Sequence, residues 1–181
     1  MNRALVPAVL ALMLAAPAVL AEPTAAGGPA NPEVQRIREF REAGERKLVA
    51  GKFTRRTLML KAAGAREDLA QRWSKLDAYY EGGTLVRLQL YPHAAISGRT
   101  EEFYVLGGHV VFAYIQDKGP KHEGRDAGEP GKEFYFDGDR LVHMEDRSGE
   151  PVRNAEGEKR MYEATLPYEV SELVWLLDHH K

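Results

Sequence analysis

Residues 77–86 read DAYYEGGTLV, and the same pattern returns as EFYVLGGHVV at residues 102–111 and as EFYFDGDRLV at residues 133–142. Each segment has an acidic residue first, a tyrosine third, a glycine sixth and two aliphatic residues last. Strand-forming residues therefore flank a glycine-containing turn in each segment, which is the pattern of a β-hairpin. Three successive hairpins predict an antiparallel meander over about residues 53–146, with six strands, or seven if the run Phe53–Lys61 is also a strand.

The alternation of apolar and polar residues constrains the hairpin loops. A two-residue loop would pair Tyr80 with Leu85 and would leave charged and apolar side chains mixed on both faces of the sheet. A three-residue loop pairs Tyr80 with Val86 and leaves one face without charge. Its third position, which suits a left-handed backbone, holds Gly83, Gly108 and Asp139. We therefore predict three-residue loops and a core face made of Leu76, Ala78, Tyr80, Val86, Leu88, Leu90, Phe103, Val105, Val111, Ala113, Ile115, Phe134, Phe136, Val142 and Met144.

The other face of the predicted sheet combines aromatic rings with charged and polar groups, and we call it the aromatic-polar face. Its strand pairing would bring Tyr79 to Arg87, Tyr104 to Phe112, Glu102 to Tyr114 and Tyr135 to His143. Such a mixture is typical of a wet recognition surface. Our candidate binding residues on it are Asp77, Tyr79, Arg87, Tyr91, Glu102, Tyr104, Phe112, Tyr114, Tyr135 and His143, and the face also includes Gln89, Glu133 and Glu145.

A purely structural role for this face is the alternative. Tyrosine pairs and arginine stacked on tyrosine stabilise antiparallel sheets by about 0.2–1 kcal/mol per pair without any ligand. One helix must cover the core face, and a second helix could cover part of the aromatic-polar face.

Two helices are predicted, one on each side of the meander in sequence. Asn31 and Pro32 form a helix start, and an apolar stripe from Val34 to Leu48 predicts a helix over residues 32–50. Apolar residues recur with helical spacing from Val170 to Leu177, which predicts a second helix over about residues 167–179. The fold class is therefore α+β, with an antiparallel meander flanked by an N-terminal and a C-terminal helix.

The first 21 residues have the three parts of a secretory signal peptide. These are Arg3, an apolar run from Ala4 to Leu20, and a small-residue cleavage pattern that ends at Ala21. The run is about 17 residues long, shorter than the roughly 20 that a spanning helix needs, so we expect cleavage and no membrane span afterwards. The expected organisation is a signal peptide over residues 1–21, a flexible leader over residues 22–31 and a single α+β domain over residues 32–181.

Composition narrows the location and the partners. The chain contains no cysteine, so it has neither a disulfide nor a thiol for lipid attachment, and we expect a periplasmic or secreted protein. With 25 Lys and Arg against 27 Asp and Glu, interleaved along the chain, a nucleic-acid partner is not expected. The expected partner is an envelope protein, an envelope polymer or a small ligand.

One local group of residues could support catalysis. Glu133, Tyr135 and His143 could hold a general base in an oriented hydrogen bond, which gives a small periplasmic hydrolase or lyase as the alternative function. The sequence has no nucleophile elbow, phosphate loop or dinucleotide motif. We predict no cofactor and no metal: His179 and His180 point apart on a helix, Asp137 and Asp139 belong to a turn, and His122-Glu123 lies in a loop.

The segments Tyr79-Tyr-Glu-Gly-Gly-Thr-Leu85 and Phe134-Tyr-Phe-Asp-Gly-Asp-Arg-Leu141 resemble those of exported bacterial proteins with repeated Tyr-Tyr/Phe-x-Asp-Asn-Gly-x-Leu hairpins. They are also distantly similar to MORN-repeat variants. The resemblance covers about residues 76–145, although the repeats are irregularly spaced and the further glycines of a regular MORN repeat are missing. It implies a meander of hairpins outside the cytoplasm and no catalytic residue. Our leading expectation is a non-enzymatic binding module; the hydrolase or lyase and a purely scaffolding module are the alternatives.

Overall fold

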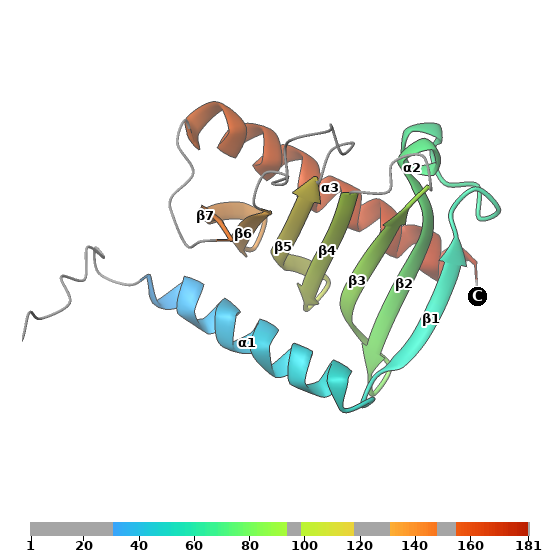
Figure 1. Ribbon diagram of the computed structural model, residues 1–181, viewed down its shortest axis with the longest axis horizontal. Helices are drawn as coiled ribbons and strands as arrows, with labels where there is room; N and C mark the ends of the chain where they lie inside the picture. Colours follow the sequence, from blue (N-terminus) through green and yellow to red (C-terminus); the bar gives the residue numbers. More distant parts are fainter. Residues whose placement is uncertain (1–30, 94–98, 118–130, 148–154, 181) are drawn as a thin grey trace, which may run out of the picture.

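The computed structural model describes residues 31–93, 99–117, 131–147 and 155–180. The predicted signal peptide and nearly all of the predicted leader lie outside the described residues. Within them the chain forms one sheet with helices on both of its faces (Figure 1).

The sheet is a meander in which every strand pairs with its neighbours in sequence. Seven described strands lie side by side in the order in which they follow along the chain, and all pairs are antiparallel. The predicted α+β meander is therefore confirmed, and the run after Phe53 is its first strand. The strands are β1 (Thr54–Met59), β2 (Trp73–Glu81), β3 (Thr84–Pro92), β4 (Arg99–Leu106), β5 (His109–Asp117), β6 (Lys132–Asp137) and β7 (Arg140–Asp146).

The hairpin loops differ from the prediction. Each contains two residues, because Glu81 pairs with Thr84, and the equivalent residues pair in the other two hairpins. Gly82 and Gly83 both have positive φ, at 57° and 86°, which is the backbone of a type I′ turn. An extra residue follows in the second strand as a β-bulge: Tyr80 pairs with Leu85, and Tyr79 pairs with Arg87. The bulge restores the face alternation that a two-residue loop alone would break, which is why the pairing of Tyr79 with Arg87 was predicted correctly.

The bulge moves three valines to the opposite face from the predicted one. The extra residues are Val86, Val111 and Val142, and they pack in the apolar cluster on the aromatic-polar side. The residues before them, Leu85, Val110 and Leu141, pack in the main core instead. The rest of the predicted core face is confirmed in the main core cluster.

Helix α3 (Ala155–His179) covers the main core and crosses behind the sheet in Figure 1. It begins well before the predicted start at Pro167, which lies inside the helix. Its buried stripe runs through the proline, from Leu166 to Val170, Leu173 and Leu177. Arg56 of β1 donates a hydrogen bond to the Leu177 carbonyl at 2.6 Å and so ties the end of α3 to the sheet edge. The short helix α2 (Glu67–Arg72) connects β1 to β2 and buries Leu69.

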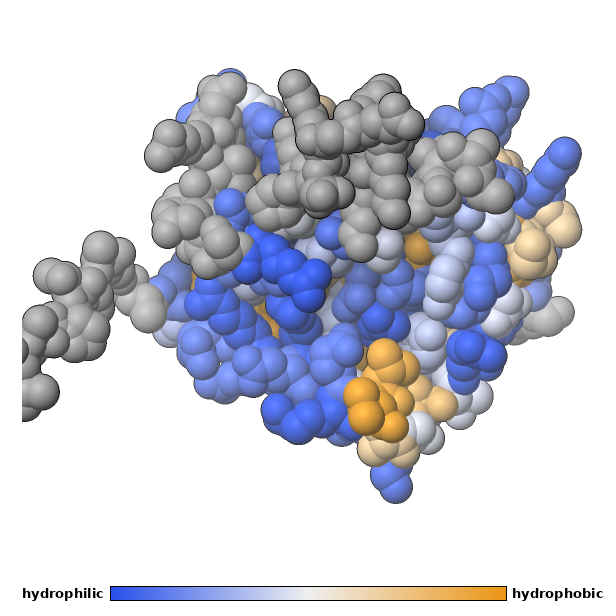
Figure 2. Space-filling view, viewed as in Figure 1, coloured by the Kyte–Doolittle hydropathy of each residue, from blue (hydrophilic) through white to orange (hydrophobic). Residues whose placement is uncertain are grey.

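Helix α1 (Pro32–Val49) lies on the other face. Asn31 caps it, since its side chain accepts a hydrogen bond from the Glu33 amide at 3.0 Å. Val34 and Ile37 pack on the sheet, and α1 runs along the end where the hairpin turns lie (Figure 1). The outer side of α1 is largely hydrophilic (Figure 2).

Candidate functional site

Helix α1 covers the turn half of the aromatic-polar face. Tyr104 and Tyr135 are 0% exposed, and Phe112 and Tyr79 are also buried. The rings of Phe40, Tyr104, Phe112 and Tyr135 form a series of edge-on contacts with centroids 5.3–6.1 Å apart. Tyr79, Tyr104, Phe112 and Tyr135 were predicted to bind a ligand; in this structure they lie under α1, whose Phe40 packs on Tyr104. The predicted pairing of Tyr104 with Phe112 and of Tyr135 with His143 is confirmed.

Arg87 is buried beneath α1 beside these rings. Its guanidinium lies 5.1 Å from the centre of the Tyr79 ring, and its Nη2 donates to Glu102 at 2.7 Å and to Gln89 at 2.8 Å. Although burial works in the other direction, Glu102 raises the pKa of Arg87. Arg87 therefore acts as the buried countercharge of Glu102.

Asp77 is also buried and has a structural role. The Thr57 hydroxyl donates to it at 2.6 Å and Lys75 Nζ at 3.3 Å. Burial opposes ionisation, but these hydrogen bonds and one from Tyr91 lower the pKa of Asp77. Lys75 Nζ also lies 3.8 Å from the centre of the Tyr91 ring. Asp77 and Tyr91 thus belong to a network of neighbouring side chains around the buried Asp77 carboxylate.

The three candidate catalytic residues do share one hydrogen-bond network. The Tyr135 hydroxyl lies 2.8 Å from Glu133 and 2.7 Å from Glu145, and it accepts from Arg38 Nε at 3.3 Å. His143 reaches Glu145 rather than Glu133, at 3.2 Å. Burial raises the pKa of Tyr135, so its hydroxyl keeps its proton and donates to one carboxylate at a time.

Arginines of α1 neutralise both carboxylates of this network. Arg38 donates to Glu145 at 2.6 Å and Arg41 donates to Glu133 at 2.9 Å. The carboxyl of Glu145 is buried, yet hydrogen bonds from Arg38, Tyr135 and His143 outweigh that burial and lower its pKa. The network therefore joins α1 to β6 and β7.

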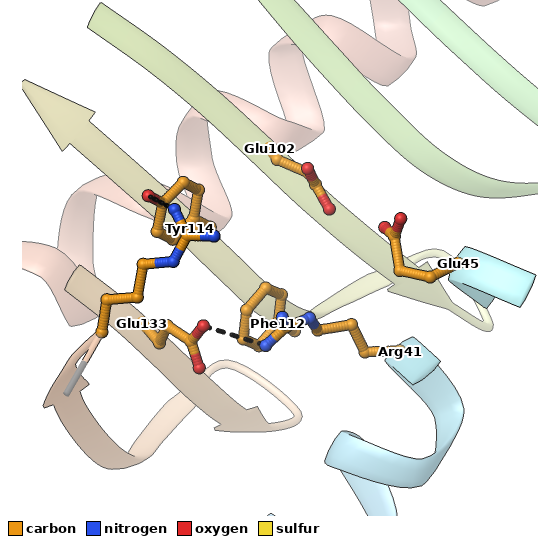
Figure 3. Close-up of a pocket in the computed structure, with 7 residues that line it drawn as sticks. Arg41, Glu45, Glu102, Phe112, Tyr114 and Glu133 are labelled. Carbon is orange, nitrogen blue, oxygen red and sulfur yellow. Dashed lines mark hydrogen bonds and ion pairs between the residues drawn. The ribbon is translucent and has the colours of Figure 1, made fainter. Parts of the chain in front are cut away.

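The half of the face that α1 leaves open contains a cleft of about 220 Å³. Glu102 of β4, Phe112 and Tyr114 of β5 and Glu133 of β6 form its floor and walls, and Arg41 and Glu45 reach in from α1 (Figure 3). Arg147, which follows β7, completes the lining. The Arg41 guanidinium lies over the Phe112 ring at 4.7 Å, and that of Arg147 lies over the Tyr114 ring at 5.9 Å. We call these seven residues the cleft.

Three of the seven cleft residues, Arg41, Glu45 and Arg147, were not among the predicted site residues. Arg41 and Glu45 lie on α1, and Arg147 directly follows β7. A sequence signal does exist: Arg38, Arg41 and Glu45 each directly follow a residue of the α1 face that packs on the sheet, namely Ile37, Phe40 and Gly44. Each therefore lies about 100° around the helix from that face, at the boundary where a long side chain can still reach the sheet.

Two further hollows, of about 300 and 340 Å³, lie along α3. In the first of these, Glu169 pairs with Arg72 at 3.2 Å and Asp68 pairs with Arg66 at 2.8 Å. The second contains one acidic residue, Asp139, which pairs with His109. The cleft differs from both hollows, because there aromatic rings lie beside charged groups of both signs that are only weakly paired.

No group of three or more potential metal ligands occurs in the described part of the chain, and His122-Glu123 lies outside it. The His179 ring donates to the Trp175 carbonyl at 2.8 Å, which is a helix-end role. None of the described helices has the length and apolar character needed to cross a membrane.

Comparisons of the chain with protein-family models, with curated proteins and with solved structures gave no match.

Proposed function

We propose that this protein is an exported, non-enzymatic binding module that takes its ligand in the cleft beside α1. The observation that carries the proposal is the incomplete cover of the aromatic-polar face. Beside α1, on the part of this face that the helix does not cover, aromatic side chains and charged side chains of both signs surround an open hollow. Ligand sites in proteins typically combine such concavity with a few converging polar groups. A cleft of this volume suits a small ligand or a short segment of a partner better than a broad protein surface.

Export rests on the sequence. Residues 1–21 have the pattern of a cleavable signal peptide, and a chain without cysteine needs no oxidative folding after export. We therefore place the ligand outside the cytoplasm, in the periplasm or beyond it.

The alternative, a hydrolase or lyase centred on Glu133, Tyr135 and His143, has less support. A general base must reach the proton that it removes, and the Tyr135 ring is buried under α1 with its hydroxyl enclosed by three partners. His143 is bound to Glu145, and both carboxylates are neutralised by arginine. This arrangement favours stability over proton transfer.

The proposal is tested by an NMR titration of the mature protein with the small-molecule fraction of a periplasmic extract. We expect shifts confined to amides near Arg41, Glu45, Phe112, Tyr114 and Glu133. The variant Arg41→Gln/Tyr114→Leu should stay folded and lose these shifts. A matched control on the opposite side, Arg66→Gln/Tyr168→Leu, alters an arginine–tyrosine pair between the residue before α2 and helix α3, and should keep these shifts. Shifts that gather elsewhere, or that persist in the cleft variant, would place the site outside the cleft.

A further inference from the structure

Only some of the charged groups in and around the cleft form close ion pairs. Arg41 pairs with Glu133 at 2.9 Å, and Arg87 pairs with Glu102 at 2.7 Å. Glu45 and Arg147 remain: Glu45 has only a longer ion pair with Arg87, at 3.7 Å, and no acidic partner of Arg147 lies among the described residues. The two leftover charges have opposite signs.

The negative end of the cleft is formed by Glu45 and Glu102, which share one guanidinium. Arg87 Nε lies 3.7 Å from Glu45, too far for a hydrogen bond, and the Glu45 side chain is 41% exposed. The Tyr104 hydroxyl donates to Glu45 and fixes its position. Burial raises the pKa of Glu102 against the opposing effect of Arg87, and the nearby Glu45 adds to the rise. Two carboxylates on one guanidinium attract a further cation.

The positive end is formed by Arg147. Its guanidinium lies over the Tyr114 ring, with Nη1 3.5 Å from the Tyr114 hydroxyl, and the residue is exposed. Planar guanidinium groups bind carboxylates through two parallel hydrogen bonds. Because no acidic partner of Arg147 lies among the described residues, it can bind an anion that enters the cleft.

The two ends are separated by an apolar floor. Figure 3 shows Tyr114 on one side of Phe112 and Glu45 on the other, with Glu102 above the ring. The cleft lining has two arginines, Arg41 and Arg147, and three glutamates. Buried Arg87, outside the lining, pairs with Glu102 and offsets the third negative charge. A ligand with a net charge would leave one charge uncompensated in a partly buried site, whereas a neutral ligand with both charges would not.

We infer that the cleft binds a small zwitterion that carries an ammonium and a carboxylate, namely a free amino acid or a very short peptide. Its ammonium binds Glu45 and Glu102, its carboxylate binds Arg147, and its side chain lies between these two ends, beside Phe112 and Tyr114. This inference rests on the proposed function, because it names the ligand class of the same cleft.

The test is calorimetric titration of the mature protein with each standard L-amino acid and with a set of dipeptides. The tightest ligand is then compared with its N-acetyl and its carboxamide derivatives, which each remove one charge. We expect each derivative to bind about tenfold or more weakly, as for the loss of one charge-assisted hydrogen bond.

Two variants test which end of the cleft binds the carboxylate of the ligand and which end binds its ammonium. Arg147→Gln should weaken the parent ligand but leave the carboxamide unaffected, and Glu45→Gln should weaken the parent but leave the N-acetyl derivative unaffected. Arg140→Gln and Glu42→Gln change exposed residues of the same types outside the cleft lining and should alter nothing.

Three outcomes would overturn the inference. If a derivative binds as tightly as its parent, or if no amino acid or dipeptide binds while the extract still shifts the cleft amides, the zwitterion is wrong and the cleft site stands. If neither the defined compounds nor the extract acts on the cleft, the proposed function fails together with the inference.

Discussion

Gly44 of α1 lies directly against the ring of Tyr104 in β4: a Cβ added at Gly44 would stand 2.5 Å from Tyr104 Cε1. This contact sets how closely α1 approaches the sheet. The side chains of Arg41 and Glu45 owe their place in the cleft to that approach, because both extend from the same helical turns.

Gly44→Ala should therefore destabilise the protein. Alanine favours a helix by up to about 1 kcal/mol over glycine, but overpacking against a buried ring costs about 1–3 kcal/mol. Gly157→Ala is the matched control, since its Cβ would enter open space in α3, and it should be neutral or stabilising. The free energies of unfolding of the two variants, from urea denaturation, decide the question. Equal effects would mean that α1 does not press on Tyr104.

Removing Arg38 should destabilise the fold in a pH-dependent manner. Arg38→Met leaves the buried Glu145 carboxylate without its guanidinium. We expect a loss of about 1–3 kcal/mol at pH 7, less than for a fully buried pair because Arg38 is partly exposed. The control Arg36→Met breaks an exposed pair with Glu33 and should cost under about 0.5 kcal/mol.

The sign of the pH dependence follows from Glu145. Its pKa is lowered in the folded protein, so its ionisation stabilises the fold above about pH 4.3, the value of an unfolded glutamate. That stabilisation disappears as the pH falls through the lowered folded value. The difference in unfolding free energy between the wild type and Arg38→Met should thus shrink on acidification. A difference that stays constant from pH 7 to pH 3 would contradict this role of Arg38.

The type I′ turns predict how substitutions at Gly83 rank. Its φ of 86° suits glycine and is tolerated by asparagine, whereas a branched side chain is strained there. Gly83→Val should lower stability by about 1–2 kcal/mol, and Gly83→Asn should lower it by clearly less. Thermal unfolding of the two variants is the measurement. Similar losses would argue against a positive φ at Gly83.

Gly131 allows the Tyr114 ring to lie in the cleft. A Cβ at Gly131 would overlap the outer atoms of that ring, which can rotate away. Gly131→Ala should therefore displace the ring at a cost below about 1 kcal/mol, while ligand binding in the cleft is lost. Denaturation and the NMR titration together check both statements. Retained binding would exclude Tyr114 from the site.

Export can be tested through processing. The mature protein recovered from the periplasm should begin at Glu22, as measured by intact mass. Leu12→Arg interrupts the apolar run and should leave unprocessed precursor in the cytoplasm, whereas Ala26→Arg, beyond the predicted cleavage site, should be processed normally. Export of the Leu12→Arg variant would refute the signal-peptide assignment.

The strand pairing of the sheet could be predicted from the sequence because it depends on local patterns. Repeated turns and alternating residues are enough to predict the pairing of Tyr79 with Arg87 and of Tyr135 with His143. The predicted loop length was wrong by one residue, because a three-residue loop and a two-residue loop followed by a bulge give the same strand pairing beyond Val86. Only the valines distinguish them, and a valine packs equally well on either face.

The start of α3 and the way in which the helices pack on the sheet could not be predicted from such local patterns. Pro167 favours a helix start by its own chemistry, but apolar packing of Leu166 on the sheet keeps the chain helical before it. Which side of α1 meets the sheet depends on contacts over long sequence separations, such as Arg38 with Glu145. The cleft forms at that contact, so its α1 residues and Arg147 were missed while Glu102, Phe112 and Tyr114 were found.

The meander order of the sheet bears on how the chain reaches its folded state. Since β1 to β7 pair only with neighbours in sequence, the sheet has low contact order and each hairpin can form with little loop-closure entropy. The sheet can then grow one strand at a time, without threading a strand between two others. Its most distant contacts are those of the helices, such as Arg38 with Glu145 and Arg56 with Leu177. We therefore expect helix docking, rather than strand pairing, to complete folding and to form the cleft last.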